Sequence, residues 1–105
     1  MGNLDLLNLD ETLLEELDMF KCGFSGMLNL TKLPNSLKKL NFAQNHFIGT
    51  PDLTKLPNSL KILRLNNNNF SGTIKLADIP ILNSLEELGL SNSGLHPWKF
   101  KMEQN

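Results

Sequence analysis

The chain has 105 residues, with 10 Lys and Arg against 11 Asp and Glu, and one cysteine. This length predicts one domain, the net charge of −1 argues against a dedicated binder of nucleic acid or anionic membranes, and one cysteine excludes an internal disulfide framework. No apolar run is long enough to insert into a membrane and no signal-peptide pattern opens the sequence. We therefore expect a cytoplasmic protein, or else a fragment of an extracellular one.

Four segments follow one eleven-residue pattern, L-x-x-L-x-L-x-x-N/C-x-L, in which the ninth position varies most. They occupy residues 14–24, 37–47, 60–70 and 85–95, so successive copies start 23, 23 and 25 residues apart. Alternating apolar residues within L-x-L predict a short strand with one buried face. One such strand cannot bury its own leucines, so stacked copies should form a parallel sheet around a shared interior. The pattern predicts a solenoid.

The first thirteen residues resemble only half of a repeat. Residues 2–12 align with residues 49–59, the half that follows a strand, and Leu13 is one extra residue. Either the chain is a piece of a longer array, or residues 1–13 are an N-terminal cap, since terminal repeats of solenoids are atypical. Six acidic residues precede the first basic one, Lys21. These acidic residues could discourage the first strand from pairing with a strand of another copy of the chain, or they could bind a basic partner.

Three full repeats follow, at residues 14–36, 37–59 and 60–84, and residues 85–95 form a last strand half. Each repeat ends in an irregular or 3₁₀ convex half, with a turn at a glycine, two buried apolar residues and a turn at a proline. Ile81 and Leu82 are inserted in the third repeat. The apolar residues expected to be buried are Leu30, Leu33, Leu53, Leu56, Leu76 and Ile79.

Two positions of the pattern should organise the interior. At the ninth position the amides of Asn45 and Asn68 are expected to bond backbone groups where the chain leaves the strand. Cys22 and Ser93 stand there in the outer copies and should fit but bond less well. At the eleventh position we expect a column of stacked aromatic rings ending at Leu95, formed by Phe24, Phe47 and Phe70.

The C-terminal residues 96–105 depart from the repeat. Trp98, Phe100 and Met102 alternate with Lys99 and Lys101, which gives one apolar and one basic face. One interpretation is a cap laid over the open end of the last coil. The other is an aromatic and basic segment that docks on a partner.

The concave face carries the candidate binding residues, at the third, fifth, seventh and eighth positions of each copy. Neighbouring strands lie about 4.8 Å apart, so Glu16 and Lys39 are expected to pair. Arg64 is flanked in its column by Asn41 and Gly89 and is expected to be unpaired, available to a carboxylate or aromatic group, or else simply solvated. The candidate partner-binding residues are Asp18, Phe20, Lys39, Asn41, Ile62, Arg64, Asn66 and Glu87.

No arrangement of residues indicates catalysis. His46 and His96 stand in unrelated positions, and no metal-binding, phosphate-binding or nucleophile motif occurs. Cys22 occupies a position expected to be buried, where a thiol behaves as a small hydrophobe. We predict that the protein is not an enzyme and has no catalytic residue, cofactor or metal site.

These features resemble the leucine-rich-repeat family over residues 2–95. Residues 69–74 and 23–26 are similar to the plant-type subclass, whereas residues 52–60 are more similar to repeats of protist proteins, including those of trypanosomatids. The resemblance implies an α/β-type leucine-rich-repeat solenoid, with a short curved parallel sheet on the concave face, a convex side with little regular α-helix, and protein recognition without a reaction of its own.

Three functions follow from this interpretation. The first is a protein–protein interaction module that binds its partner through the concave face, with no nucleic acid and no membrane insertion. The second is a structural subunit or segment of a larger array that joins a neighbouring subunit at its N- or C-terminal end. The third is a piece of a surface antigen or receptor ectodomain, which glycans at the sequons of Asn29 or Asn69 would indicate.

Overall fold

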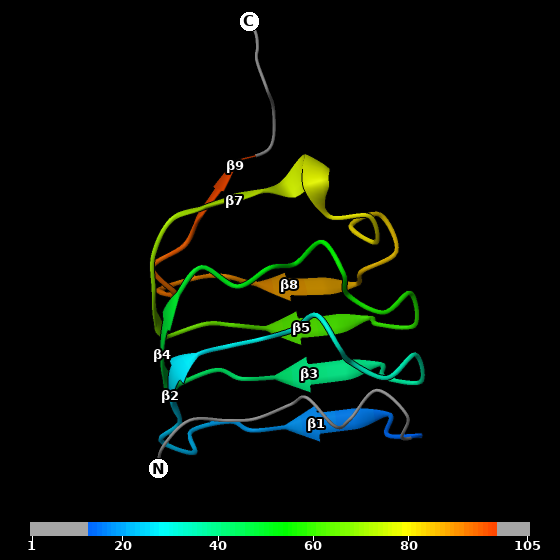
Figure 1. Cartoon of the computed structure of the whole chain (residues 1–105), viewed down its shortest axis with the longest axis horizontal. Helices are drawn as coiled ribbons and strands as arrows, with labels where there is room; N and C mark the ends of the chain where they lie inside the picture. The colour runs from blue at the N-terminus through cyan, green and yellow to red at the C-terminus, as the bar shows by residue number, and fades with distance from the viewer. Residues whose placement is uncertain (1–12, 99–105) are drawn as a thin grey trace, which may run out of the picture.

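The computed structural model describes residues 13–98, which form a solenoid of short parallel strands (Figure 1). We name its turns coil one (residues 14–36), coil two (37–59), coil three (60–84) and coil four (85–98). Within the described range the only helical element is a 3₁₀ turn, so the predicted fold is confirmed. The elements are β1 (Glu16–Asp18), β2 (Ser25–Met27), β3 (Lys39–Asn41), β4 (His46–Gly49), β5 (Ile62–Arg64), β6 (Asn69–Phe70), β7 (Thr73–Lys75), η1 (Leu76–Asp78), β8 (Glu87–Gly89) and β9 (His96–Trp98).

The main sheet consists of β1, β3, β5 and β8 in that order, and all its pairs are parallel. Figure 1 shows these strands as successive rungs. Their central leucines are direct partners, Leu17 with Leu40, Leu40 with Leu63, and Leu63 with Leu88. Leu40 and Leu63 are completely buried, whereas the outer two are half-buried because only one described coil packs against each. The leucines of the pattern therefore form one shared interior.

A second ladder, which the sequence did not predict, runs along the edge of the solenoid. It consists of β2, β4 and β6, and a third, two-stranded sheet joins β7 to β9. Before β2, β4, β6 and β9 the chain turns through one non-glycine residue with a left-handed backbone, at φ between 53° and 58°. These residues are Lys21, Gln44, Asn67 and Asn92.

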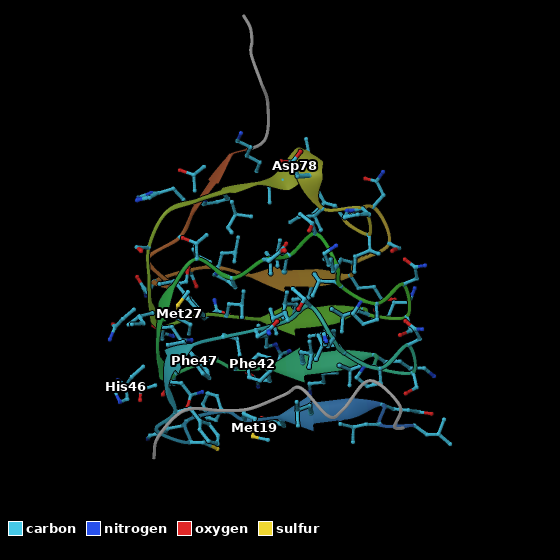
Figure 2. The ribbon with its side chains drawn as sticks, viewed as in Figure 1. Met19, Met27, Phe42, His46, Phe47 and Asp78 are labelled. Atoms are coloured by element: carbon cyan, nitrogen blue, oxygen red, sulfur yellow. The ribbon has the colours of Figure 1, made fainter. Side chains whose placement is uncertain are left out.

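The predicted column of stacked aromatic rings is confirmed, and it lies on the inner side of the second ladder. Phe24 stacks on Phe47 with ring centroids 6.4 Å apart, and Phe47 stacks on Phe70 at 6.2 Å. Phe42 meets Phe47 edge-on at 6.0 Å. Figure 2 shows Phe42 and Phe47 in the interior and the neighbouring His46 at the outer edge. Leu95 is buried at the corresponding position of coil four. The preceding Gly94 has φ +92°, and a β-carbon there would collide with the carbonyl of Phe70.

Asparagines join coil two to coil one and coil three to coil two. The Oδ1 of Asn45 accepts from the amides of Cys22 (3.1 Å) and Phe24 (3.0 Å), and its Nδ2 donates to the carbonyls of Met19 (2.8 Å) and Phe42 (2.9 Å). Thus one amide group bonds backbone atoms of both coil one and coil two. The predicted role of this position is confirmed, and the bonds extend across the coil boundary.

Asn68 repeats this arrangement one coil further. Its Oδ1 accepts from the amide of Phe47 at 3.2 Å, and its Nδ2 donates to the carbonyls of Phe42 (3.0 Å) and Leu65 (3.2 Å). In coil four the hydroxyl of the shorter Ser93 bonds only its own coil, donating to the carbonyl of Leu90 and accepting from the amide of Leu95. The smaller residue therefore makes fewer bonds, as expected.

The convex halves are held by serine hydroxyls. Ser36 donates to the carbonyl of Leu14 at 2.7 Å and Ser59 to that of Leu37 at 2.5 Å, so each joins the last residue of its coil to the first. Ser84, which follows the two-residue insertion, donates instead to Ile81 three residues earlier. The apolar residues expected on this side are buried except Leu76, which is half-buried at the start of η1.

The predicted terminal segments fall largely outside the described residues. The half-repeat at residues 1–13 is described only at Leu13, and residues 99–105 of the predicted tail are not described. Residues 96–98 form β9, whose backbone pairs with β7.

We predict that Asn68→Ala lowers the free energy of unfolding by about 2–4 kcal/mol, because it leaves buried backbone groups of two coils without partners. Urea unfolding monitored by circular dichroism measures the change. The control is Asn69→Ala, which removes the exposed neighbouring asparagine and should change stability by less than about 0.5 kcal/mol. A similar decrease in the free energy of unfolding for both variants would contradict a bridging role for Asn68.

Candidate functional site

The outer face of the main sheet, with the turn that follows each strand, holds all the candidate binding residues. We name this surface the sheet face. Parallel pairing places its side chains in columns, with Glu16, Lys39, Ile62 and Glu87 in one column and Asp18, Asn41, Arg64 and Gly89 in the next. Because alternate residues of a strand point to opposite sides, these columns lie opposite the buried leucines.

The candidate residues differ in how far they reach solvent. Asp18 and Glu87 are exposed, Phe20 is 46% exposed, and Lys39, Ile62, Arg64 and Asn66 are half-buried. The expectation that all of them point freely outward is wrong for Asn41, which is only 6% exposed. Its Oδ1 accepts from the amide of Ala43 at 3.0 Å, so the side chain folds back on its own turn. Asp18 accepts from the amide of Phe20 in the same way.

Two ion pairs cross the rungs of the sheet face. Lys39 lies 3.7 Å from Glu16, so the pairing expected along this column is confirmed. The prediction that Arg64 is unpaired is wrong. Its Nε donates to Oε2 of Glu87 at 2.6 Å, and its second guanidinium nitrogen donates to Oε1 at 3.1 Å.

The pairing of Arg64 runs diagonally between columns. Its direct partner in register is Gly89, which has no side chain to block the guanidinium from reaching Glu87 two residues earlier on β8. Hydrogen bonds from the guanidinium hold the pKa of Glu87 below its usual value, and the same bonds hold the pKa of Arg64 above its own. Asn66 also leans over coil four, where its Nδ2 donates to the hydroxyl of Ser91 at 2.6 Å.

The structure has two hollows that were not predicted from the sequence. A polar hollow of about 460 Å³ follows the left-handed turns and is lined by Lys21, Gln44, Asn45, His46 and Asn67. A groove of about 280 Å³ separates the convex halves of coils two and three, and its lining includes Asp52, Leu53, Lys75 and Asp78. Hydrogen bonds from the hydroxyl and amide of Thr54 lower the pKa of Asp52.

The described part of the chain has neither a metal-binding cluster nor a membrane-spanning helix. Among residues 13–98, no group of three or more His, Cys, Asp or Glu side chains could hold a metal ion. Nor does this part of the chain include a helix with the length and apolar character that a bilayer crossing requires. His46 and His96 lie on β4 and β9, strands of different sheets.

Comparison with known proteins identifies the class. Residues 59–77 match the family model for the Leucine Rich Repeat, which covers β5, β6, β7 and the start of η1. No curated protein and no solved structure matched the chain. Together with the four-rung parallel solenoid, the match shows that this chain is a leucine-rich-repeat protein. Repeats of this family generally mediate protein–protein interaction and do not catalyse reactions.

We predict that Arg64→Ala raises the pKa of Glu87 toward its ordinary value of 4.5, because the guanidinium that stabilises the carboxylate is removed. The depressed pKa in the folded state contributes stability above the unfolded pKa, and this contribution is lost as the pH falls through the folded value. Carboxyl-carbon NMR titration measures the change. The exposed Lys75→Ala should leave the titration of Glu87 unchanged; an unshifted Glu87 in Arg64→Ala would contradict the pairing.

Proposed function

We propose that the protein binds a partner protein through the sheet face, using Asp18, Phe20, Lys39, Asn41, Ile62, Arg64, Asn66 and Glu87. The observation that supports this proposal is the contrast between the two sides of the main sheet. One side packs the leucine core, and the other carries charged, amide and aromatic side chains with no covering layer among residues 13–98.

The arrangement of the sheet face favours binding because several of its side chains are already fixed. The guanidinium of Arg64 is held by two hydrogen bonds to Glu87, and Lys39 is held by Glu16. A partner that docks on ordered side chains loses less conformational entropy than one that must order them. Phe20 adds an exposed aromatic surface at the N-terminal end of the face, the residue type that often anchors an interface.

A second candidate function is assembly through the ends of the solenoid. Among the described strands, β1 and β8 each pair along one edge only, and Leu17 and Leu88 are half-buried. Analytical ultracentrifugation separates the two proposals, because end-to-end assembly grows with concentration, whereas a binding module remains monomeric.

We predict that Phe20→Ala lowers the capture of a partner several-fold without a change in melting temperature, since the ring lies on the proposed contact surface and outside the core. Immobilised protein would be exposed to an extract of the source cells, and captured proteins quantified by mass spectrometry. The matched control is Ile48→Ala, which truncates an equally exposed apolar side chain on the second ladder (50%, against 46% for Phe20).

The expected result is that the same captured protein is reduced with Phe20→Ala and retained with Ile48→Ala. Equal capture by both variants, or a loss that follows the melting temperature, would contradict binding through the sheet face.

A further inference from the structure

The ion pairs of the sheet face leave one strand carboxylate without a bonded cation. The two cations on its strands are paired, Lys39 with Glu16 and Arg64 with Glu87. The remaining carboxylate, Asp18, makes no ion pair within residues 13–98. Its Oδ1 accepts from the amide of Phe20 at 3.0 Å, and within the same range its other oxygen has no donor. Asp18 therefore presents to solvent a carboxylate that no cation among residues 13–98 contacts, and Arg64 attracts it only at longer range.

Nearby cations are directed elsewhere. Arg64 lies two rungs from Asp18 in the same column, with Asn41 between them, and its guanidinium bonds coil four. Lys21 follows Phe20, but its left-handed backbone leads into the polar hollow, which its side chain lines together with Gln44 and His46. A cation from outside the chain could therefore approach Asp18.

An exposed aromatic residue follows this carboxylate in the chain. Phe20 is 46% exposed, two residues from Asp18 and bonded to it through its amide. The residue at the same position of the next coil is the small, buried Ala43, so that no large side chain from that coil covers the ring. A carboxylate and an exposed aromatic residue two positions apart suit a planar cation, which can bond the first and stack on the second.

Asn41 supplies an independent sign of a binding site. It is the direct neighbour of Asp18 in the sheet and is 6% exposed. Its Oδ1 accepts from the amide of Ala43, which fixes the orientation of the amide group, but its Nδ2 donates to no acceptor in the described part of the chain. Buried polar groups are normally hydrogen-bonded, so an unpartnered donor here calls for an acceptor from outside.

We propose that Asp18, Phe20 and Asn41 form a subsite for an arginine side chain of the partner protein. The guanidinium bonds the carboxylate of Asp18 and stacks on Phe20, while a main-chain carbonyl oxygen next to the arginine accepts from Asn41. This inference rests on the proposed function and adds the chemistry of the group that is recognised. Lysine lacks the planar fork that bonds and stacks at once, and an acidic group would be repelled by Asp18.

The test is an NMR titration of the isotopically labelled protein with the peptide acetyl-Gly-Arg-Gly-amide. We expect saturable shifts of the amides of Asp18, Phe20 and Asn41. The same peptide with citrulline, a neutral analogue of arginine, should bind about tenfold more weakly, because a charge-assisted hydrogen bond is lost. A lysine peptide should also bind more weakly than the arginine peptide.

Two variants of the protein make the test specific. Asp18→Asn removes the charge but keeps an acceptor for the amide of Phe20, as Asn41 does for Ala43 in coil two, and should weaken arginine binding about tenfold. Asp52→Asn makes the same chemical change at a turn on the convex side, where Asp52 accepts from Thr54, and should leave binding unchanged.

Absence of saturable shifts at these residues, equal binding of the citrulline or lysine peptide, or an unaffected Asp18→Asn would each overturn the arginine subsite. The capture experiment with Phe20→Ala is independent of these outcomes. A partner that is lost with Phe20→Ala but retained with Asp18→Asn would leave binding through the sheet face intact and refute only the arginine assignment.

Discussion

Asn45 and Asn68 stand where the chain turns off a strand and leaves backbone groups without partners in the sheet. Each asparagine bonds atoms of its own coil and of the coil before it, so that neither coil completes its hydrogen bonds alone. The apolar groups obey the same constraint, since the ring of Phe47 is covered by one phenylalanine from each neighbouring coil. Stability in this fold therefore belongs to the contacts between coils.

This constraint also produces the sheet face. Coils locked in register by their asparagines and leucines place outer side chains in straight columns one rung apart. Opposite charges on adjacent rungs then meet, as Glu16 and Lys39 do, or bridge diagonally, as Arg64 and Glu87 do. The packing of the interior thereby determines which charged side chains pair with one another. At the N-terminal end of the sheet face, Asp18 remains available to a partner.

The features that repeat were predictable from the sequence, and the others were not. The leucine rungs, the aromatic column and the bonded asparagines occur in several copies, so one pattern predicted them all. The strands of the second ladder, Ser25–Met27, His46–Gly49 and Asn69–Phe70, lack the alternating L-x-L that marks the equally short strands of the main sheet. Asn41 is buried because its side chain bonds the turn that follows its strand. Arg64 is paired because it reaches diagonally past Gly89 to Glu87. A comparison of residues within one column of the sheet misses both contacts. Lys21 and Gln44 gave no sign of a left-handed backbone, which their residue types rarely adopt.

The coupling between coils is tested most directly by native-state hydrogen exchange of the amides that bridge them. The amides of Phe24 and Phe47, which donate to the asparagine of the next coil, and those of Leu40 and Leu63 in the main sheet should exchange only through global unfolding. All four should then show one common free energy, equal to that from urea unfolding. If the amides of one coil exchanged at a clearly lower free energy while the others stayed protected, the coils would be separate units and the account would be wrong.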